Sequence, residues 1–138
     1  MTSMNDEIVA TFRANAGAVG GHFEGKRLVL LHHIGRRSGQ ERVTPLVGAS
    51  DGDSYLVCGS LGGAEEDPVW VANIEDGPGE TTIEVGDRTQ RVKTTVVRST
   101  SPEWERLYGI WKAYWPDAAQ YEARTSRRFP VIRLDPIA

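Results

Sequence analysis

The sequence has one cysteine, no surplus of basic residues and no apolar run of membrane-spanning length. Cys58 alone can form neither an intramolecular disulfide nor a cysteine-based metal cluster. Sixteen lysines and arginines stand against nineteen aspartates and glutamates, a balance that argues against a nucleic-acid-binding protein. No apolar run approaches the roughly 18 residues that a membrane-spanning helix needs, and the N-terminus has no signal-peptide pattern. We therefore expect a cytoplasmic protein that does not span a membrane.

The sequence also lacks the common patterns of metal and nucleotide sites. His32 and His33 are adjacent in a predicted strand, so their side chains point to opposite faces, and His22 has no partner at a useful spacing. The phosphate-binding fingerprints G-x-x-x-x-G-K-[ST] and G-x-G-x-x-G are absent. We predict no metal site and none of the familiar nucleotide-binding loops.

The length of 138 residues and the 39% hydrophobic content fit one domain over residues 1–138 with an ordinary core. Short runs rich in valine, leucine and threonine alternate with turn signals such as Asp51-Gly52 and Gly86-Asp87. They predict about six antiparallel strands, at 27–34, 43–50, 54–59, 81–85, 89–97 and 131–134. Helices are expected at 1–16, as a short turn at 69–74, and at 101–114 and 118–126. The fold class is thus mainly β, and many short hairpin strands favour a barrel.

One connection, between residues 33 and 46, has the composition of an anion-binding loop. Gly35 and Gly39 allow positive φ, so that successive backbone N–H groups can converge on one point as a nest. Nearby arginines offer planar forks for phosphate or carboxylate oxygens, and hydroxyl groups can donate further hydrogen bonds. These side chains are Arg36, Arg37, Ser38, Arg42 and Thr44. Residue types alone leave open a solvated hairpin connection with a tight turn at Ser38-Gly39.

The segments 35–39 (GRRSG) and 42–46 (RVTPL) resemble the signature of the deazaflavin-dependent nitroreductase and quinone reductase family of actinobacteria, which uses coenzyme F420. Further matches, in the same order, include Pro68-Val69-Trp70, Asn73 and Pro130-Val131-Ile132, and they extend over nearly the whole chain. The resemblance implies a split β-barrel like that of FMN-binding oxidoreductases. It also implies a cofactor whose tail carries a phosphate and several glutamates.

The resemblance assigns cofactor-binding positions along the chain. Those implied for the tail are Arg36, Arg37, Ser38, Gly39 and Arg42, and those beside the ring are Thr44, Pro45 and Leu46. Further contacts are implied at Ser60, Leu61, Gly62, Trp70 and Asn73. Leu61 stands where the family commonly has a lysine, so the loss of that cation is expected to weaken tail binding or shift the preferred tail length.

Aromatic side chains are the candidates for holding the substrate, namely Trp70, Trp111, Tyr114 and Trp115. We predict Tyr114 as a catalytic residue that donates a hydrogen bond or a proton to an acceptor oxygen. For each of the four, packing in the core is the alternative interpretation.

The resulting hypothesis is an F420H2-dependent oxidoreductase that transfers a hydride to a quinone, an enone or a nitroaromatic compound. Alternatives are an FMN-dependent oxidoreductase of the same fold, a deazaflavin carrier without turnover, and an interaction domain whose basic loop binds an acidic partner. Peripheral membrane contact through the N-terminal helix and the oligomeric state are left open.

Overall fold

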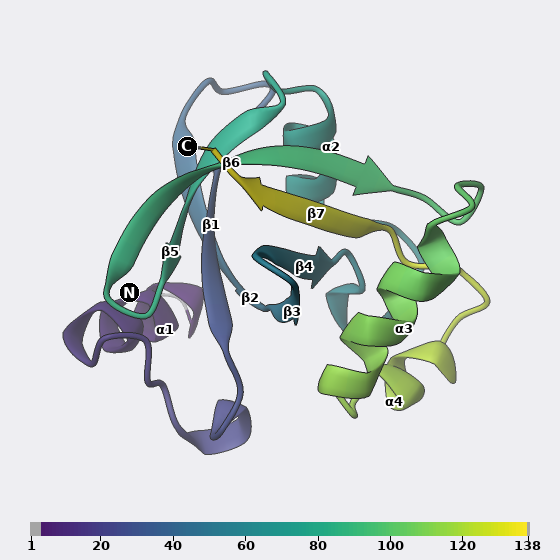
Figure 1. Ribbon diagram of the computed structural model, residues 1–138, viewed down its shortest axis with the longest axis horizontal. Coiled ribbons are helices and arrows are strands. Elements are labelled where there is room, and N and C mark those ends of the chain that lie inside the picture. Colours follow the sequence, from purple (N-terminus) through teal and green to yellow (C-terminus); the bar gives the residue numbers. More distant parts are fainter. Residues whose placement is uncertain (1–3, 138) are drawn as a thin grey trace.

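The computed structural model describes residues 4–137, which form a curled antiparallel sheet with helices at its sides (Figure 1). The seven strands pair in the order β2-β1-β5-β6-β7-β4-β3. Their bounds are β1 Leu28–Ile34, β2 Glu41–Val47, β3 Ala49–Asp51, β4 Ser54–Cys58, β5 Glu80–Val85, β6 Arg88–Val97 and β7 Val131–Pro136. The helices are α1 Met4–Ala14, α2 Val69–Glu75, α3 Trp104–Tyr114 and α4 Ala118–Glu122, with short 3-10 turns η1 Gly21–Phe23 and η2 Leu61–Gly63. The mainly β, split-barrel prediction is confirmed.

Strand β1 lies near the middle of the molecule and is buried on both faces. Leu28 and Leu30 pack into one hydrophobic cluster, whereas Val29 and Leu31 pack into another on the opposite face. This alternation follows from the period of two in a strand, and it explains why the sequence of β1 is a continuous apolar run. The first cluster draws on α1 and α3, and the second draws on α2.

The second predicted strand, 43–50, is divided in the structure into β2 and β3, which corrects the prediction at this point. The division falls at Gly48, whose N–H donates to the carbonyl of Arg27. A Cβ at Gly48 would lie 2.5 Å from a methyl carbon of Val29, so only glycine fits here. The close contact lets the chain bend from one side of the curled sheet to the other.

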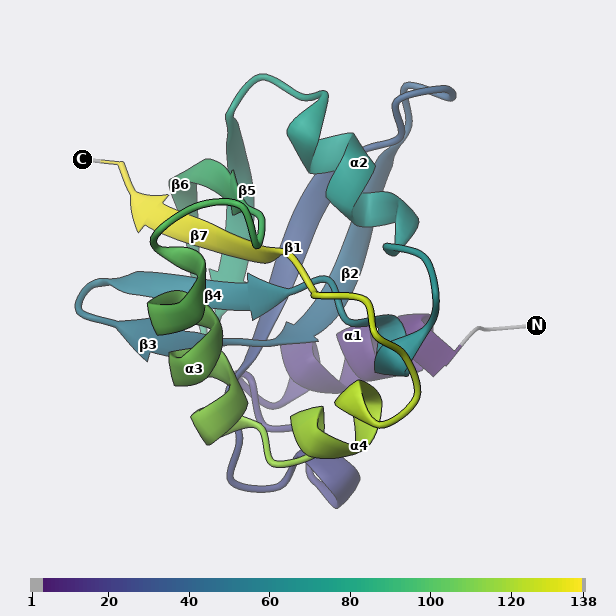
Figure 2. The same ribbon diagram turned by 90° about the vertical axis from the view of Figure 1, so that its right-hand side faces the viewer.

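Helices cover the sheet at positions that matter for the site. Figures 1 and 2 show α3 beside β3 and β4, α1 beside β2, and α2 close to β1. Two tryptophans of α3 fix this helix, because the indole N–H of Trp104 donates to the carbonyl of Phe129 (2.8 Å) and that of Trp111 to the carbonyl of Val47 (3.1 Å). Within residues 4–137, no helix is long and apolar enough to cross a membrane.

Candidate functional site

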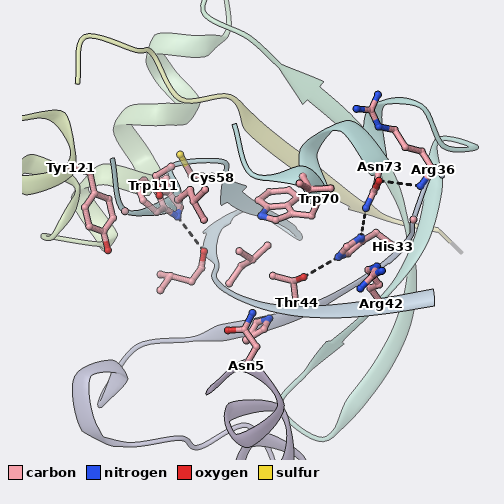
Figure 3. A pocket seen from close by; sticks show the side chains of 18 of the residues that line it. Asn5, His33, Arg36, Arg42, Thr44, Cys58, Trp70, Asn73, Trp111 and Tyr121 are labelled. Atoms are coloured by element: carbon pink, nitrogen blue, oxygen red, sulfur yellow. Dashed lines mark hydrogen bonds between the residues drawn. The ribbon is translucent and has the colours of Figure 1, made fainter. Parts of the chain in front are cut away.

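A cavity of about 820 Å³ lies between the β1–β2 hairpin, α2, the η2 loop and the C-terminal helices (Figure 3). It brings together all of the predicted cofactor-binding residues except Gly39, and all three of the predicted substrate-binding tryptophans, of which Trp70 belongs to both sets. These are Arg36, Arg37, Ser38, Arg42, Thr44, Pro45, Leu46, Ser60, Leu61, Gly62, Trp70 and Asn73, with Trp111 and Trp115. Gly35 of the predicted anion-binding loop also lines the cavity, and the lining residues that no sequence pattern marked are Asn5, Phe23, His33, Val47, Cys58, Val69 and Tyr121.

The loop between β1 and β2 is a tight hairpin connection that satisfies its own backbone. The N–H of Gly35 donates to the carbonyl of Gln40 (2.9 Å), and the N–H of Gly39 donates to the carbonyl of Gly35 (2.8 Å). The N–H of Gln40 donates to Ser38 Oγ (3.2 Å). The N–H groups of both glycines are therefore used within the loop, and of the two only Gly39 has a positive φ (+71°).

The three arginines near this loop are not equivalent. The guanidinium of Arg36 forms an ion pair with Asp76 at 3.2 Å, and both side chains are about half exposed. The side chains of Arg37 and Arg42 have no hydrogen bond or ion pair with any residue of 4–137, and both line the cavity. They are the two cations that can bind an anionic ligand without first breaking a protein contact.

A chain of hydrogen bonds leads from the hairpin to the cavity wall (Figure 3). The N–H of Arg36 donates to Asn73 Oδ1 (3.1 Å), and the Asn73 amide nitrogen lies 3.0 Å from His33 Nδ1. His33 Nε2 in turn lies 2.9 Å from Thr44 Oγ1. Burial, followed by the positive charge of Arg42, lowers the pKa of His33 to about 4, so the imidazole is neutral at neutral pH.

Two buried side chains carry polar groups that have no protein partner among the described residues. Trp70 is 6% exposed, and its indole N–H has no acceptor, although the other three tryptophans all donate to protein atoms. Figure 3 shows the indole nitrogen of Trp70 facing the cavity. Ser60 is 7% exposed and lines the same cavity, and its hydroxyl is likewise unpartnered. Both groups can hydrogen-bond a ligand.

Tyr114 does not line the cavity, which corrects its predicted place in the site. Its hydroxyl accepts a hydrogen bond from the N–H of Arg27 (2.6 Å), and the ammonium of Lys26 lies 4.7 Å from the centre of its ring. Tyr121 lines the cavity instead, and its hydroxyl accepts from the indole N–H of Trp115 (3.1 Å). Because an indole nitrogen only donates, the hydroxyl proton of Tyr121 stays available to another acceptor.

The η2 loop, which carries Ser60, is held in place by an arginine from the C-terminal segment. The guanidinium of Arg127 donates to the carbonyls of Gly59 (3.1 Å), Ser60 (2.9 Å) and Ala64 (2.9 Å). It also pairs with the carboxylate of Asp67 at 2.6 Å. These contacts tie the loop to the C-terminal segment of the chain.

Leu61 and Val69 form an apolar rim at the cavity. Leu61 is 59% exposed and Val69 is 74% exposed, and both line the opening. Leu61 has a φ of +44°, a value that is uncommon for a residue other than glycine. The cation that the family resemblance places at this position is absent, and Arg124 reaches the same loop by donating to the carbonyl of Gly62 (2.8 Å).

The remaining lining is aromatic or inert. Phe23 stacks on Trp115 with ring centres 5.7 Å apart, so the 3-10 turn η1 closes one side of the cavity. Burial raises the pKa of the Cys58 thiol, which keeps it protonated and a poor nucleophile. Among residues 4–137, no three metal-ligating side chains gather in a group that could hold a metal ion.

Known proteins resemble this chain in sequence and in fold. A family model described as F420H2-dependent quinone reductase matches residues 4–136. An F420H2-dependent quinone reductase of Mycobacterium tuberculosis is 34% identical over 127 residues, which cover 91% of this chain and 85% of that protein. A solved structure of an F420H2-dependent reductase superposes with a TM-score of 0.70 at 25% identity, covering 84% of this chain and all of that one. A haem storage protein of Vibrio cholerae shares the fold at 13% identity, with a TM-score of 0.61 over 100% of this chain and 92% of its own.

Proposed function

The chain belongs to the family of F420H2-dependent quinone reductases, and we propose that the cavity beside the β1–β2 hairpin binds both coenzyme F420 and the electron acceptor. Membership makes the protein an oxidoreductase with coenzyme F420 as its cofactor and a quinone as its acceptor. The proposal adds the location and the roles of individual side chains.

The observation that carries the proposal is the hydrogen-bonding character of the lining. Among residues 4–137, no aspartate or glutamate lines the cavity, whereas two unpaired arginines and several unpartnered donors do. A deazaflavin with a phosphate and carboxylates on its tail and carbonyl oxygens on its ring offers mostly acceptors. The donor set therefore fits this cofactor, and it disfavours ligands that carry cations.

We assign the tail to Arg37 and Arg42, which are exposed, unpaired and beside the tight hairpin. Thr44, Ser60 and Trp70 offer donors to the ring system from the cavity wall. When bound, the reduced cofactor supplies the hydride. The chain itself has to orient the ring and the acceptor, exclude water and provide hydrogen bonds.

For the acceptor, we assign the aromatic side of the cavity. Phe23, Trp111 and Trp115 provide flat apolar surface that suits a quinone ring and excludes water. Tyr121 is placed to donate a hydrogen bond to an acceptor oxygen on which negative charge develops. Nitroaromatic compounds and enones share the planar shape and the oxygen acceptors, and we propose them as additional substrates.

The exposed apolar rim suits quinones that partition into membranes. We propose that the protein is cytoplasmic and that it takes up such quinones at a membrane surface without inserting a helix. Helix α1 has acidic residues in its first turn, and its one basic residue near the end, Arg13, is paired with Glu84. Contact would therefore depend on apolar side chains, and co-sedimentation with neutral vesicles would test it.

The function is tested by titrating the purified protein with F420 and, separately, with FMN, and then by following reoxidation of bound F420H2 by menadione. We expect tight binding of F420, weaker binding of FMN and rapid reoxidation that depends on menadione. Failure to bind F420 would refute the assignment of the cavity. Binding without reoxidation would favour a carrier of the cofactor.

A further inference from the structure

Both ring nitrogens of His33 are hydrogen-bonded to protein side chains, so neither is free to bind a ligand in the cavity. It is 5% exposed at the end of β1, between Asn73 on α2 and Thr44 on β2. Figure 3 shows the three side chains in a row, with Thr44 nearest the centre of the cavity. This arrangement fixes the direction of each hydrogen bond.

The direction follows from the outer end of the row. A backbone N–H can only donate, so the contact of Arg36 N with Asn73 at 3.1 Å requires the amide oxygen of Asn73 on that side. The amide nitrogen of Asn73 then faces His33 Nδ1 at 3.0 Å, and it too can only donate. Nδ1 of His33 must therefore be the unprotonated acceptor.

A neutral imidazole whose Nδ1 accepts carries its proton on Nε2. That N–H donates to Thr44 Oγ1 at 2.9 Å. The hydroxyl of Thr44 has one proton, and His33 offers it no acceptor, so the proton is free for a group in the cavity that Thr44 lines.

We infer that His33 is a positioning residue that makes Thr44 a fixed hydrogen-bond donor to the bound cofactor, an inference that rests on the proposed function. The group that it serves is an acceptor oxygen or nitrogen of the deazaflavin ring. A threonine without such a neighbour can rotate its hydroxyl and both donate and accept. In this site His33 fills one acceptor site of Thr44 Oγ1 and offers the hydroxyl proton no acceptor, so the proton is directed to the ligand.

The tautomer is tested first, on the protein without cofactor. A two-bond ¹H–¹⁵N spectrum of the histidine rings, with His33 assigned by comparison with His33→Leu, reports which nitrogen carries the proton. We expect a neutral ring with the proton on Nε2 at neutral pH. A proton on Nδ1, or a doubly protonated ring, would overturn the inference.

The consequence for binding is tested by a double-mutant cycle on F420 affinity. Thr44→Val keeps the shape but removes the hydroxyl, and it should weaken binding about tenfold, the effect of losing one hydrogen bond. His33→Leu should weaken binding by a smaller factor alone and by none when Thr44→Val is already present, because the two residues act as one unit. Thr44→Ser should restore most of the affinity.

His32 provides a matched control, because it is the adjacent residue on the opposite face of β1 and bonds to Glu84 (2.7 Å). His32→Gln should leave F420 affinity within about twofold of wild type. If His33→Leu lowers F420 affinity equally with and without Thr44→Val, His33 has a merely structural role. That result would refute this inference and leave the proposed function standing. Wild-type affinity of Thr44→Val would refute it even if every His33 variant failed to fold. A wild-type protein that binds no F420 would overturn the proposed function as well.

Discussion

Replacement of Arg127 by methionine tests whether the η2 loop is held by the protein rather than by the ligand. The guanidinium makes hydrogen bonds to three backbone carbonyls and an ion pair with Asp67, and its side chain is only 15% exposed. Hydrogen bonds of charged groups contribute roughly 1.5–3 kcal/mol each in mutational series. They are not additive, and water replaces some of them, so we expect a total loss of about 3 kcal/mol in the free energy of unfolding.

Urea unfolding followed by circular dichroism measures this loss, and hydrogen exchange of the amides in segment 59–64 measures the local effect. Arg127→Lys should lose most of the same stability, since an ammonium group cannot span the carbonyls as the planar fork does. Arg128→Met is the matched control: the Arg128 guanidinium is exposed and lies 5.7 Å from the ring of Trp104 without a hydrogen bond. It should cost less than about 1 kcal/mol.

The functional consequence should appear in F420 affinity, because the loop carries Ser60 to the cavity wall although Arg127 itself does not line the cavity. An Arg127→Met variant within about 1 kcal/mol of wild type, with unchanged exchange rates in the loop, would refute the reasoning. It would mean that water satisfies these carbonyls equally well.

Three further predictions follow from the site. Combined Arg37→Ala and Arg42→Ala should weaken F420 binding about 30-fold at low salt, or about 1 kcal/mol for each exposed cation, and the loss should shrink as salt is added in equilibrium titrations. Tyr121→Phe should slow menadione reduction at unchanged F420 affinity in single-turnover kinetics, whereas Tyr114→Phe should leave turnover unchanged. The pKa of His33 is lowered in the folded state, so as pH falls the unfolded chain takes up a proton before the folded protein does. Urea unfolding should therefore show the free energy of unfolding falling by roughly 2–3 kcal/mol as pH drops from about 6.5 to about 4. His33→Gln should lack that slope.

Each of these has a contrary outcome. Salt-independent losses in the arginine variant would place the anion elsewhere. Equal slowing by both tyrosine replacements would point to packing of the C-terminal helices rather than to a hydrogen bond. A His33→Gln protein with the wild-type pH slope would assign that slope to other groups.

Local features of the fold could be predicted from the sequence, and the pairing of distant strands could not. The hairpin β5–β6 and the turn at Gly52 can be predicted from neighbouring residues. The continuous apolar run of β1 predicts burial on both faces of that strand. The division between β2 and β3 depends on the contact of Gly48 with Val29. The pairing of β6 with β7 and of β7 with β4 joins segments far apart in the chain, and no local pattern encodes it.

The site was predictable to the extent that its residues share a motif. The arginines and the Trp70 to Asn73 spacing mark the cavity from the sequence, whereas the pairing of Arg36 with Asp76 depends on the position of α2. Tyr114 and Tyr121 are both aromatic residues near a helix break, and only the tertiary structure separates them. One lies under Lys26, and the other lies at the cavity.

Two lining side chains, His33 and Trp115, orient the hydroxyl groups of their neighbours. His33 directs the hydroxyl proton of Thr44, and Trp115 does the same for Tyr121 by occupying an acceptor site on its oxygen. In each pair, the facing residue carries a hydroxyl with one proton, and its neighbour donates to the oxygen and offers that proton no acceptor, so the proton is left for the ligand. A motif records the facing residue and not the direction of its hydrogen bond. Relatives with the same threonine but no histidine behind it should therefore present a hydroxyl whose proton is not directed toward the ligand.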